Sequence, residues 1–286
     1  MKYILQNLCC LLLFAAGTCR AQTTGHTFRS GGIDRTYRLH LPEGLPAGAP
    51  LVIVLHGYGG QARPESFGMN EVADRHGFAV CYPQGERDGR GKTCWNVGYP
   101  FQADMTVDDV RFLTELVRHL QKKHGLSRHN VFCTGMSNGG EMCYQLAAQR
   151  PRLFAAVAPV SGLMLDWLYK ADRSTAPVPL FEIHGTEDRT SAWLGDPQNK
   201  GGWGAYLPVP LAVHYWAAKN RCTVMQTDTL PAKAPGGRTV IAHRFTGGTG
   251  GSEVWLYEIV GGKHSWGEQD IDTGEELWKF FSRFVK

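Results

Sequence analysis

Residues 135–139 read Gly-Met-Ser-Asn-Gly, a Gly-x-Ser-x-Gly pentapeptide. The apolar run 131–133 enters it, and a helical pattern over 141–149 leaves it. In so sharp a turn between strand and helix, the serine takes a strained backbone conformation and its hydroxyl stands above the sheet. The two glycines fit because a side chain at either position would collide with a neighbouring strand or helix. The pattern predicts that Ser137 is a nucleophile that attacks carbonyl carbon.

The pentapeptide alone is a modest signal, because the chain has 35 glycines and a glycine-rich turn is the alternative. Its surroundings favour the nucleophile. The run 131–133 suits a buried strand. The following segment places Gly140, Cys143, Tyr144 and Ala147 on one stripe of a helix.

A serine nucleophile of this kind needs an acid and then a base later in the chain. The strand candidate 178–183 leads into a loop that carries Asp188, and the strand candidate 254–260 leads into a loop that carries His264. Taken alone, the aspartate could be a cap and the histidine a solvated loop residue. Together they fill both positions in the required order. Asp188 is the predicted acid, with Glu187 as a neighbour or a backup.

The apolar run Leu51–Leu55 is typical of a strand buried on both faces, and His56-Gly57-Tyr58-Gly59-Gly60 follows it. Such a loop offers a backbone N–H to an oxyanion that develops during acyl transfer. We assign the oxyanion donors as the N–H groups of Tyr58 and Asn138. His56 is interpreted as a structural residue that bonds within the loop, not as a base.

These residues need a scaffold, and the rest of the chain alternates strand and helix patterns. Such alternation predicts an α/β fold with a mostly parallel sheet, helices on both faces, and ligands at the carboxyl ends of the strands. Further strands are predicted at 26–29 and 34–41 (a hairpin broken at Gly31-Gly32), 78–82 and 154–160. Further helices are predicted at 71–76, 211–219 and 275–285. Another is predicted to begin after Thr106, which would cap it with Asp109 as its capping-box partner. Gly- and Pro-rich segments at 233–238 and 246–252 indicate turns between antiparallel strands.

Several short segments spread over the chain carry a family resemblance. They are Leu55–Gly60, Tyr82–Gly85, Cys94–Asn96, Val107–Val110, Gly135–Gly140, His184–Asp188, Trp216 with Asn220 and Cys222, and Gly261–Trp266. In this order and spacing they resemble the secreted polyhydroxybutyrate depolymerase-like esterases and the related feruloyl and acetylxylan esterases. The resemblance implies an α/β-hydrolase fold with Ser137, Asp188 and His264 as a catalytic triad. The chain departs from the family pattern over Arg189–Pro210, a stretch rich in Trp and Gly.

Four substrate classes follow from this reading: feruloyl esters, acetylxylan, polyhydroxyalkanoates and peptides. A peptidase of the prolyl-oligopeptidase kind usually carries a large extra domain, and a polyester depolymerase more often adds a polymer-binding module. Neither is expected from this sequence. We therefore favour feruloyl or acetyl esters of plant-wall polysaccharide, with polyhydroxybutyrate-type polyester as the alternative. Trp193, Trp203, Tyr206 and Trp266 are candidates to stack on sugar or phenolic rings, unless they only pack the loops. A non-catalytic binding protein on this scaffold is a further alternative, which the intact Ser, Asp and His set disfavours.

The first residues are typical of a secretory signal. Lys2 precedes a short apolar core at 8–16, and Cys19-Arg20-Ala21 supplies a cleavage site, so we expect cleavage after Ala21 and an esterase domain over 22–286. The protein is then secreted or periplasmic, without a membrane span. Lipidation at Cys19 is the alternative, although Thr18 suits it poorly. Without Lys2 and Arg20, 28 basic residues face 26 acidic ones, and this charge of about +2 gives no sign of a nucleic-acid partner.

Cleavage would also remove three cysteines, Cys9, Cys10 and Cys19. The remaining five are Cys81, Cys94, Cys133, Cys143 and Cys222. An odd number leaves at least one thiol free, and the pairing of the others stays open. Cys133 and Cys143 fit core patterns. No spacing of Cys and His resembles a metal site, so we predict neither metal nor cofactor. The expected partner is a small ester or an ester-decorated polysaccharide, and the oligomeric state stays open.

Overall fold

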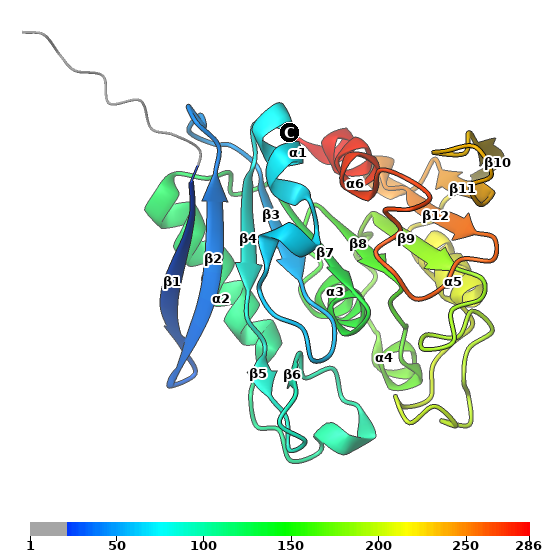
Figure 1. The fold of residues 1–286 in the computed structure, drawn as a ribbon, viewed down its shortest axis with the longest axis horizontal. Coiled ribbons are helices and arrows are strands. Elements are labelled where there is room, and N and C mark those ends of the chain that lie inside the picture. The colour runs from blue at the N-terminus through cyan, green and yellow to red at the C-terminus, as the bar shows by residue number, and fades with distance from the viewer. Residues whose placement is uncertain (1–21) are drawn as a thin grey trace, which may run out of the picture.

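A computed structural model of the chain describes residues 22–286. The predicted signal segment 1–21 and its three cysteines lie outside the described residues. A ten-stranded sheet runs through the molecule in the order β1-β2-β4-β3-β7-β8-β9-β12-β11-β10 (Figure 1). The six middle strands pair in parallel, whereas the two outer strands on each side pair antiparallel. The prediction of a mostly parallel sheet is therefore confirmed.

The sheet strands have these bounds: β1 Gln22–Ser30, β2 Ile33–Leu41, β3 Leu51–Leu55, β4 Ala79–Pro83, β7 Val131–Met136, β8 Ala156–Val160, β9 Leu180–Gly185, β10 Val224–Leu230, β11 Val240–Thr246 and β12 Val254–Ile259. A separate small hairpin joins β5 Glu86–Arg87 to β6 Thr93–Cys94. Apart from β1, which begins four residues earlier than predicted, the predicted strands agree with these within two residues at their amino ends. At their carboxyl ends β7 and β9 run two or three residues further than predicted.

Helices cover both faces of the sheet (Figure 1). They are α1 Met69–His76, α2 Asp109–His124, α3 Asn138–Gln149, α4 Asp166–Ala171, α5 Val209–Lys219 and α6 Thr273–Phe281, with 3₁₀ turns at Pro64–Ser66, Pro100–Gln102, Thr249–Gly251 and Ser282–Phe284. Alternate residues of a strand point to opposite faces. On β3, Ile53 packs with the α2, α3 and α5 side, while Val52 and Val54 pack with the α1 and α6 side. None of the helices in residues 22–286 combines the length and apolar character needed to cross a bilayer.

The start of α2 differs from the prediction. Thr106 does not cap the helix with Asp109 as its partner. Asp108 is the N-cap, and its carboxylate accepts a hydrogen bond from Arg111 N at 2.8 Å. Asp109 is buried and accepts a hydrogen bond from Arg35 Nη2 at 2.7 Å. The capping-box pattern failed because Asp109 serves a buried ion pair with a distant strand rather than a local cap.

The five cysteines of the described chain are free thiols. Cys133 of β7 and Cys143 of α3 are buried, with their Sγ atoms 3.6 Å apart. This agrees with the core position that their sequence patterns predicted. Burial raises the pKa of the Cys143 thiol well above its usual value, as does the neighbouring Cys133. Both side chains pack as small apolar groups between β7 and α3.

Candidate active site

Ser137 occupies the turn between β7 and α3 with φ 56° and ψ −122°, a conformation that few side-chain-bearing residues adopt. Its N–H donates to Val160 O at 2.8 Å, which ties the turn to β8. A Cβ atom added at Gly135 would lie 2.7 Å from Leu55 Cβ, and one at Gly139 would lie 2.4 Å from Leu55 O. Only glycine therefore lets β3 pass this close beneath the turn, as the pentapeptide predicted.

The loops after β9 and β12 bring an acid and a base together. His264 Nδ1 donates to Asp188 Oδ2 at 2.7 Å. The other oxygen of Asp188 accepts from the N–H groups of Thr190 and Ser191, each at 2.8 Å. Glycine again permits the approach, because a Cβ at Gly185 would lie 2.3 Å from the backbone of the second loop. These contacts fix the tautomer of His264 and leave its Nε2 as the nitrogen that can take up a proton.

Asp188 is set up to stay ionised. Burial by itself would raise the pKa of its carboxyl, but the hydrogen bond and charge of His264, the Ser191 N–H and the charge of His184 together lower that pKa below its usual value. Glu187 is exposed and lies beside this arrangement rather than within it. The geometry therefore supports Asp188 over Glu187 as the partner of His264.

His184 was not predicted to contribute to the site. It is fully buried on β9, and its Nδ1 lies 2.8 Å from Glu182 Oε1 while its Nε2 lies 2.8 Å from Ser191 O and 3.6 Å from Asp188 Oδ2. Both ring nitrogens thus face acceptors, and only the protonated ring can donate to both. Burial raises the pKa of Glu182 above its usual value, while the hydrogen bonds from His184 and from Tyr144, the latter at 3.0 Å, act against this rise.

The pKa of His184 follows from these contacts. Burial lowers the pKa of the imidazolium, but the hydrogen bond and charge of Glu182, with Ser191 O and Asp188, raise it above its usual value. Glu182 and His184 stand two residues apart in a strand, so their side chains share one face. A charged pair at this spacing inside an apolar run was the signal available in the sequence.

His56 has the structural role that was predicted. Its Nδ1 donates to Gly57 O at 2.8 Å, and its Nε2 accepts from Gly85 N at 3.0 Å and from the Gln84 side-chain amide at 2.9 Å. One donor and one acceptor nitrogen require the neutral ring. Burial lowers its pKa to about 4. This neutral ring holds the loop after β3 in place.

The loop after β3 passes directly beside Ser137, since a Cβ added at Gly57 would lie 3.3 Å from Ser137 Cβ. Tyr58 in this loop donates its hydroxyl to Asp88 Oδ2 at 2.6 Å. Asn138 is the first residue of α3, where a backbone N–H has no acceptor within the helix. The Oδ1 atom of its buried side chain accepts a hydrogen bond from Trp95 N at 2.7 Å. The two predicted oxyanion donors therefore lie on segments that flank Ser137.

A cavity of about 520 Å³ opens over Ser137 and His264. Its lining consists of 56–61, Arg63, Ser66, Phe67, Met136, Ser137 and His264. No hydrogen bond joins Ser137 Oγ to His264 among the side chains described. Serine–histidine hydrogen bonds of this type are often long without substrate and tighten when it binds. Ser137 and His264 thus line the same cavity.

Two of the four predicted aromatic residues lie one layer behind the cavity wall. Trp266 is buried and meets Phe67 edge-on, with ring centroids 5.0 Å apart. Trp203 meets Tyr58 edge-on at 5.3 Å. Phe67 and Tyr58 themselves line the cavity. Trp266 and Trp203 can therefore act on a substrate by supporting the rings that face it.

The other two predicted aromatic residues lie further from Ser137. Trp193 packs against His184, with ring centroids 6.0 Å apart. Tyr206 is buried, and its hydroxyl accepts a hydrogen bond from Ala192 N at 3.1 Å. Neither lines the cavity that holds Ser137 and His264. Both hold the loop after β9, which was the alternative role considered for these aromatic residues.

Comparison with solved structures supports the fold. The acetyl xylan esterase from Aspergillus awamori superposes with a TM-score of 0.64 over 92% of this chain and 100% of that chain, at 18% identity. The S-formylglutathione hydrolase from Agrobacterium tumefaciens gives a TM-score of 0.57 over 93% of this chain and 96% of that chain, at 13% identity. The chain therefore has the α/β-hydrolase fold that its sequence predicted.

Comparison with curated sequences identifies the family. The sequence pattern of the Esterase PHB depolymerase family matches residues 35–175. "Putative esterase NocK" from Nocardia uniformis subsp. tsuyamanensis is 31% identical over 263 residues, which covers 86% of this chain and 74% of that protein. Poly(3-hydroxyalkanoate) depolymerase C from Paucimonas lemoignei is 29% identical over 65% of this chain, and acetylxylan esterase A from Aspergillus oryzae (strain ATCC 42149 / RIB 40) is 27% identical over 57%. The chain spans only 44% and 56% of the lengths of these last two proteins. The chain is a carboxylic ester hydrolase that belongs to the Esterase PHB depolymerase family.

Proposed function

We propose that the protein is a serine esterase that works through an acyl-enzyme, with Ser137 as nucleophile, His264 as base and Asp188 as the orienting acid. The observation that carries this proposal is the 2.7 Å hydrogen bond from His264 to Asp188 in a site whose cavity also holds the strained Ser137. The three residues follow the carboxyl ends of β7, β9 and β12, which belong to the parallel part of the sheet.

The proposed reaction follows from this arrangement. His264 Nε2 takes the Ser137 proton as Oγ bonds to the ester carbonyl carbon. The Tyr58 and Asn138 N–H groups stabilise the resulting oxyanion, each by about 3 kcal/mol of barrier in comparable sites. The C–O bond to the alcohol then breaks, and His264 returns its proton to the departing oxygen. Water hydrolyses the acyl-serine in the same way, and Asp188 stabilises the imidazolium in both steps.

For the substrate we propose feruloyl or acetyl esters on plant-wall sugars. Two observations support it. The first is that the relatives include acetylxylan esterase A and feruloyl esterase B from Thermothelomyces thermophilus (strain ATCC 42464 / BCRC 31852 / DSM 1799). The second is that the cavity presents the apolar side chains of Phe67 and Met136. The poly(3-hydroxyalkanoate) depolymerase relative keeps a polyester as the second candidate. We also propose export, because the charge at Lys2, the apolar run 8–16 and the small residue Ala21 form a signal pattern.

A substrate panel tests the proposal: methyl ferulate, acetylated xylan, 3-hydroxybutyrate oligomers and p-nitrophenyl acetate. We expect turnover of p-nitrophenyl acetate and of at least one wall ester. A stronger rate on 3-hydroxybutyrate oligomers than on every wall ester would make the polyester reading correct.

The aromatic wall allows a finer test of the substrate. A ferulate ring stacked on Phe67 gains about 1 kcal/mol beyond its area burial, and an acetyl group gains nothing there. Changing Phe67, or the supporting Trp266 or Trp203, to Ala should raise KM for methyl ferulate more than for p-nitrophenyl acetate. Equal losses on both substrates would mean that these rings only hold the loops.

A further inference from the structure

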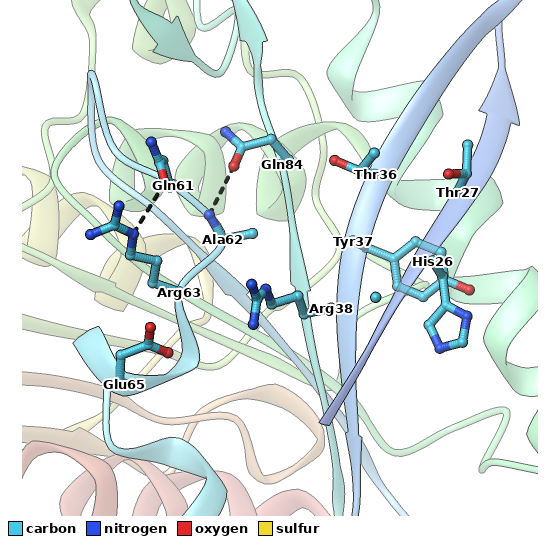
Figure 2. Close-up of a pocket in the computed structure, with 11 residues that line it drawn as sticks. His26, Thr27, Thr36, Tyr37, Arg38, Gln61, Ala62, Arg63, Glu65 and Gln84 are labelled. Atoms are coloured by element: carbon cyan, nitrogen blue, oxygen red, sulfur yellow. Dashed lines mark hydrogen bonds between the residues drawn. The ribbon is translucent and has the colours of Figure 1, made fainter. Parts of the chain in front are cut away.

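A second hollow, of about 600 Å³, lies beside the catalytic cavity between the β1–β2 hairpin and the segment 61–65. We call it the arginine pocket, after Arg38 of β2 and Arg63. Gln61 and Arg63 line both hollows, so the catalytic cavity and the arginine pocket are adjacent and share these side chains as a common wall. Figure 2 shows Arg38 extending from its strand toward the segment that carries Gln61, Arg63 and Glu65.

The sheet order creates this neighbourhood. β2 pairs antiparallel with β4, and Arg38 lies opposite Tyr82, near the carboxyl end of β4. That end is the edge of the parallel sheet where the catalytic loops gather. A residue of the amino-terminal hairpin therefore stands beside the loop that follows the proposed oxyanion segment.

Hydrogen bonds hold the wall that the two hollows share. Arg63 Nε donates to Gln61 Oε1 at 3.1 Å, which leaves the outer nitrogens of its guanidinium free of that contact. Ala62 N donates to Gln84 Oε1 at 2.9 Å, and the Gln84 amide in turn contacts His56 Nε2 at 2.9 Å. The wall of the arginine pocket is thus bonded to the same histidine that holds the loop beside Ser137.

The charge of the pocket suits an anion with a single charge. Among the residues described, no carboxylate lies within 4.0 Å of the guanidinium of Arg38 or Arg63. His26 is the remaining side chain of the lining that could add positive charge, and burial and nearby cations, Lys123 foremost, lower its pKa and disfavour its charged form. Two guanidinium groups and the Glu65 carboxylate leave one net positive charge. A carboxylate matches this charge, and guanidinium groups bind carboxylates through paired hydrogen bonds.

We propose that the arginine pocket binds a carboxylate carried on the alcohol part of the ester substrate, with Arg38 and Arg63 as its ligands. This inference rests on the proposed esterase function. Two kinds of substrate present such a group at that place. An acetylated or feruloylated xylan can carry a uronic acid on the sugar that departs as the alcohol. A 3-hydroxybutyrate oligomer ends in a carboxylate on its departing alcohol.

The test compares acid and neutral forms of the same ester. One pair is a 3-hydroxybutyrate trimer as the free acid and as its methyl ester. The other pair is an acetylated xylo-oligosaccharide with and without a glucuronic acid branch. We expect kcat/KM of the wild type to favour the acid member of at least one pair by about tenfold, through a lower KM, and high salt to reduce this preference. The pair that responds identifies the source of the carboxylate.

Variants locate the effect. Arg38→Gln and Arg63→Gln should each lower the acid-to-neutral ratio, and the double variant should bring it close to one. Arg128→Gln is the matched control, because it removes the same charge at a distant place. Arg128 is exposed in the turn before β7, at the opposite end of the strands. A wild-type ratio of one, or a ratio unchanged in the double variant, would overturn the proposal. Either result with p-nitrophenyl acetate still hydrolysed would leave the esterase assignment standing, whereas loss of all hydrolysis in the wild type would refute that assignment instead.

Discussion

Two buried histidines, His56 and His184, lie on opposite sides of Ser137, and their surroundings shift their pKa values in opposite directions. His56 follows β3 and donates through one nitrogen while it accepts through the other. His184 ends β9 and faces acceptors with both nitrogens. Burial alone would lower the pKa of both rings, yet only His56 has a lowered pKa, because only His184 has a carboxylate partner. Hydrogen-bond partners, rather than depth, decide the charge.

The difference gives each side of the site its task. The neutral His56 holds the loop that carries Tyr58, one of the two proposed oxyanion donors. The cationic His184 lies 3.6 Å from Asp188 Oδ2, the oxygen that also binds His264. A positive charge there favours the ionised carboxylate that a triad acid requires.

The largest expected effect separates the two adjacent carboxylates of the loop after β9, Asp188 and Glu187. Asp188→Asn should lower kcat on p-nitrophenyl acetate by about 10⁴-fold, as loss of the orienting carboxylate does in other triads. Glu187→Gln removes an exposed charge one residue away and should change kcat little. Steady-state kinetics of both variants measures this, and the reverse ranking would move the acid to Glu187.

A second test removes the charge of His184. His184→Gln leaves Glu182 buried without a cation and should lower the free energy of unfolding by about 3–5 kcal/mol. The double variant Glu182→Gln with His184→Gln should recover much of that stability. In the double variant the acid limb of the pH–rate profile should move to higher pH, because Asp188 has lost a cation that lowers its pKa. An unmoved profile would mean that His184 only fills space.

The smallest effect concerns stability against pH. The lowered pKa of His56 makes its contribution complete above pH 6.5 and progressively lost as pH falls toward 4. Denaturant unfolding of the wild type should therefore lose about 2 kcal/mol more between pH 7 and pH 5 than unfolding of His56→Gln. The raised pKa of His184 acts in the opposite sense, with its contribution complete below pH 6.5 and lost as pH rises through the folded value. Identical pH slopes in wild type and His56→Gln would contradict the neutral assignment of His56.

The sequence predicted those parts of the site that local patterns encode. The pentapeptide at 135–139 requires a tight strand-to-helix turn. The apolar runs before Asp188 and His264 predict strands that end at the same edge of the sheet. Local patterns could not encode contacts set by the order of the sheet. Arg38 lines the arginine pocket only because β2 pairs with β4. Phe67 lines the cavity together with Gln61, Arg63 and Ser66 of the same segment.

Two predictions differ from the structure for the same physical reason. The pattern at Thr106 and Asp109 predicted a capping box, but a buried ion pair with Arg35 takes up the Asp109 carboxylate. The aromatic residues after Asp188 were predicted to face a substrate, yet Tyr206 packs inside the loop and Trp193 against His184. In both cases a tertiary contact, which the local sequence does not encode, determines the position of the side chain.

The most direct test of the central claim is covalent labelling with a fluorophosphonate probe, which reacts with activated serines. The account predicts one adduct per chain by intact-protein mass spectrometry, located on Ser137 by peptide mapping. Ser137→Ala should remove both the adduct and the hydrolysis of p-nitrophenyl acetate while circular dichroism stays unchanged. An adduct on another serine, a well-folded wild type that takes no label, or a Ser137→Ala variant with activity within tenfold of the parent would contradict it.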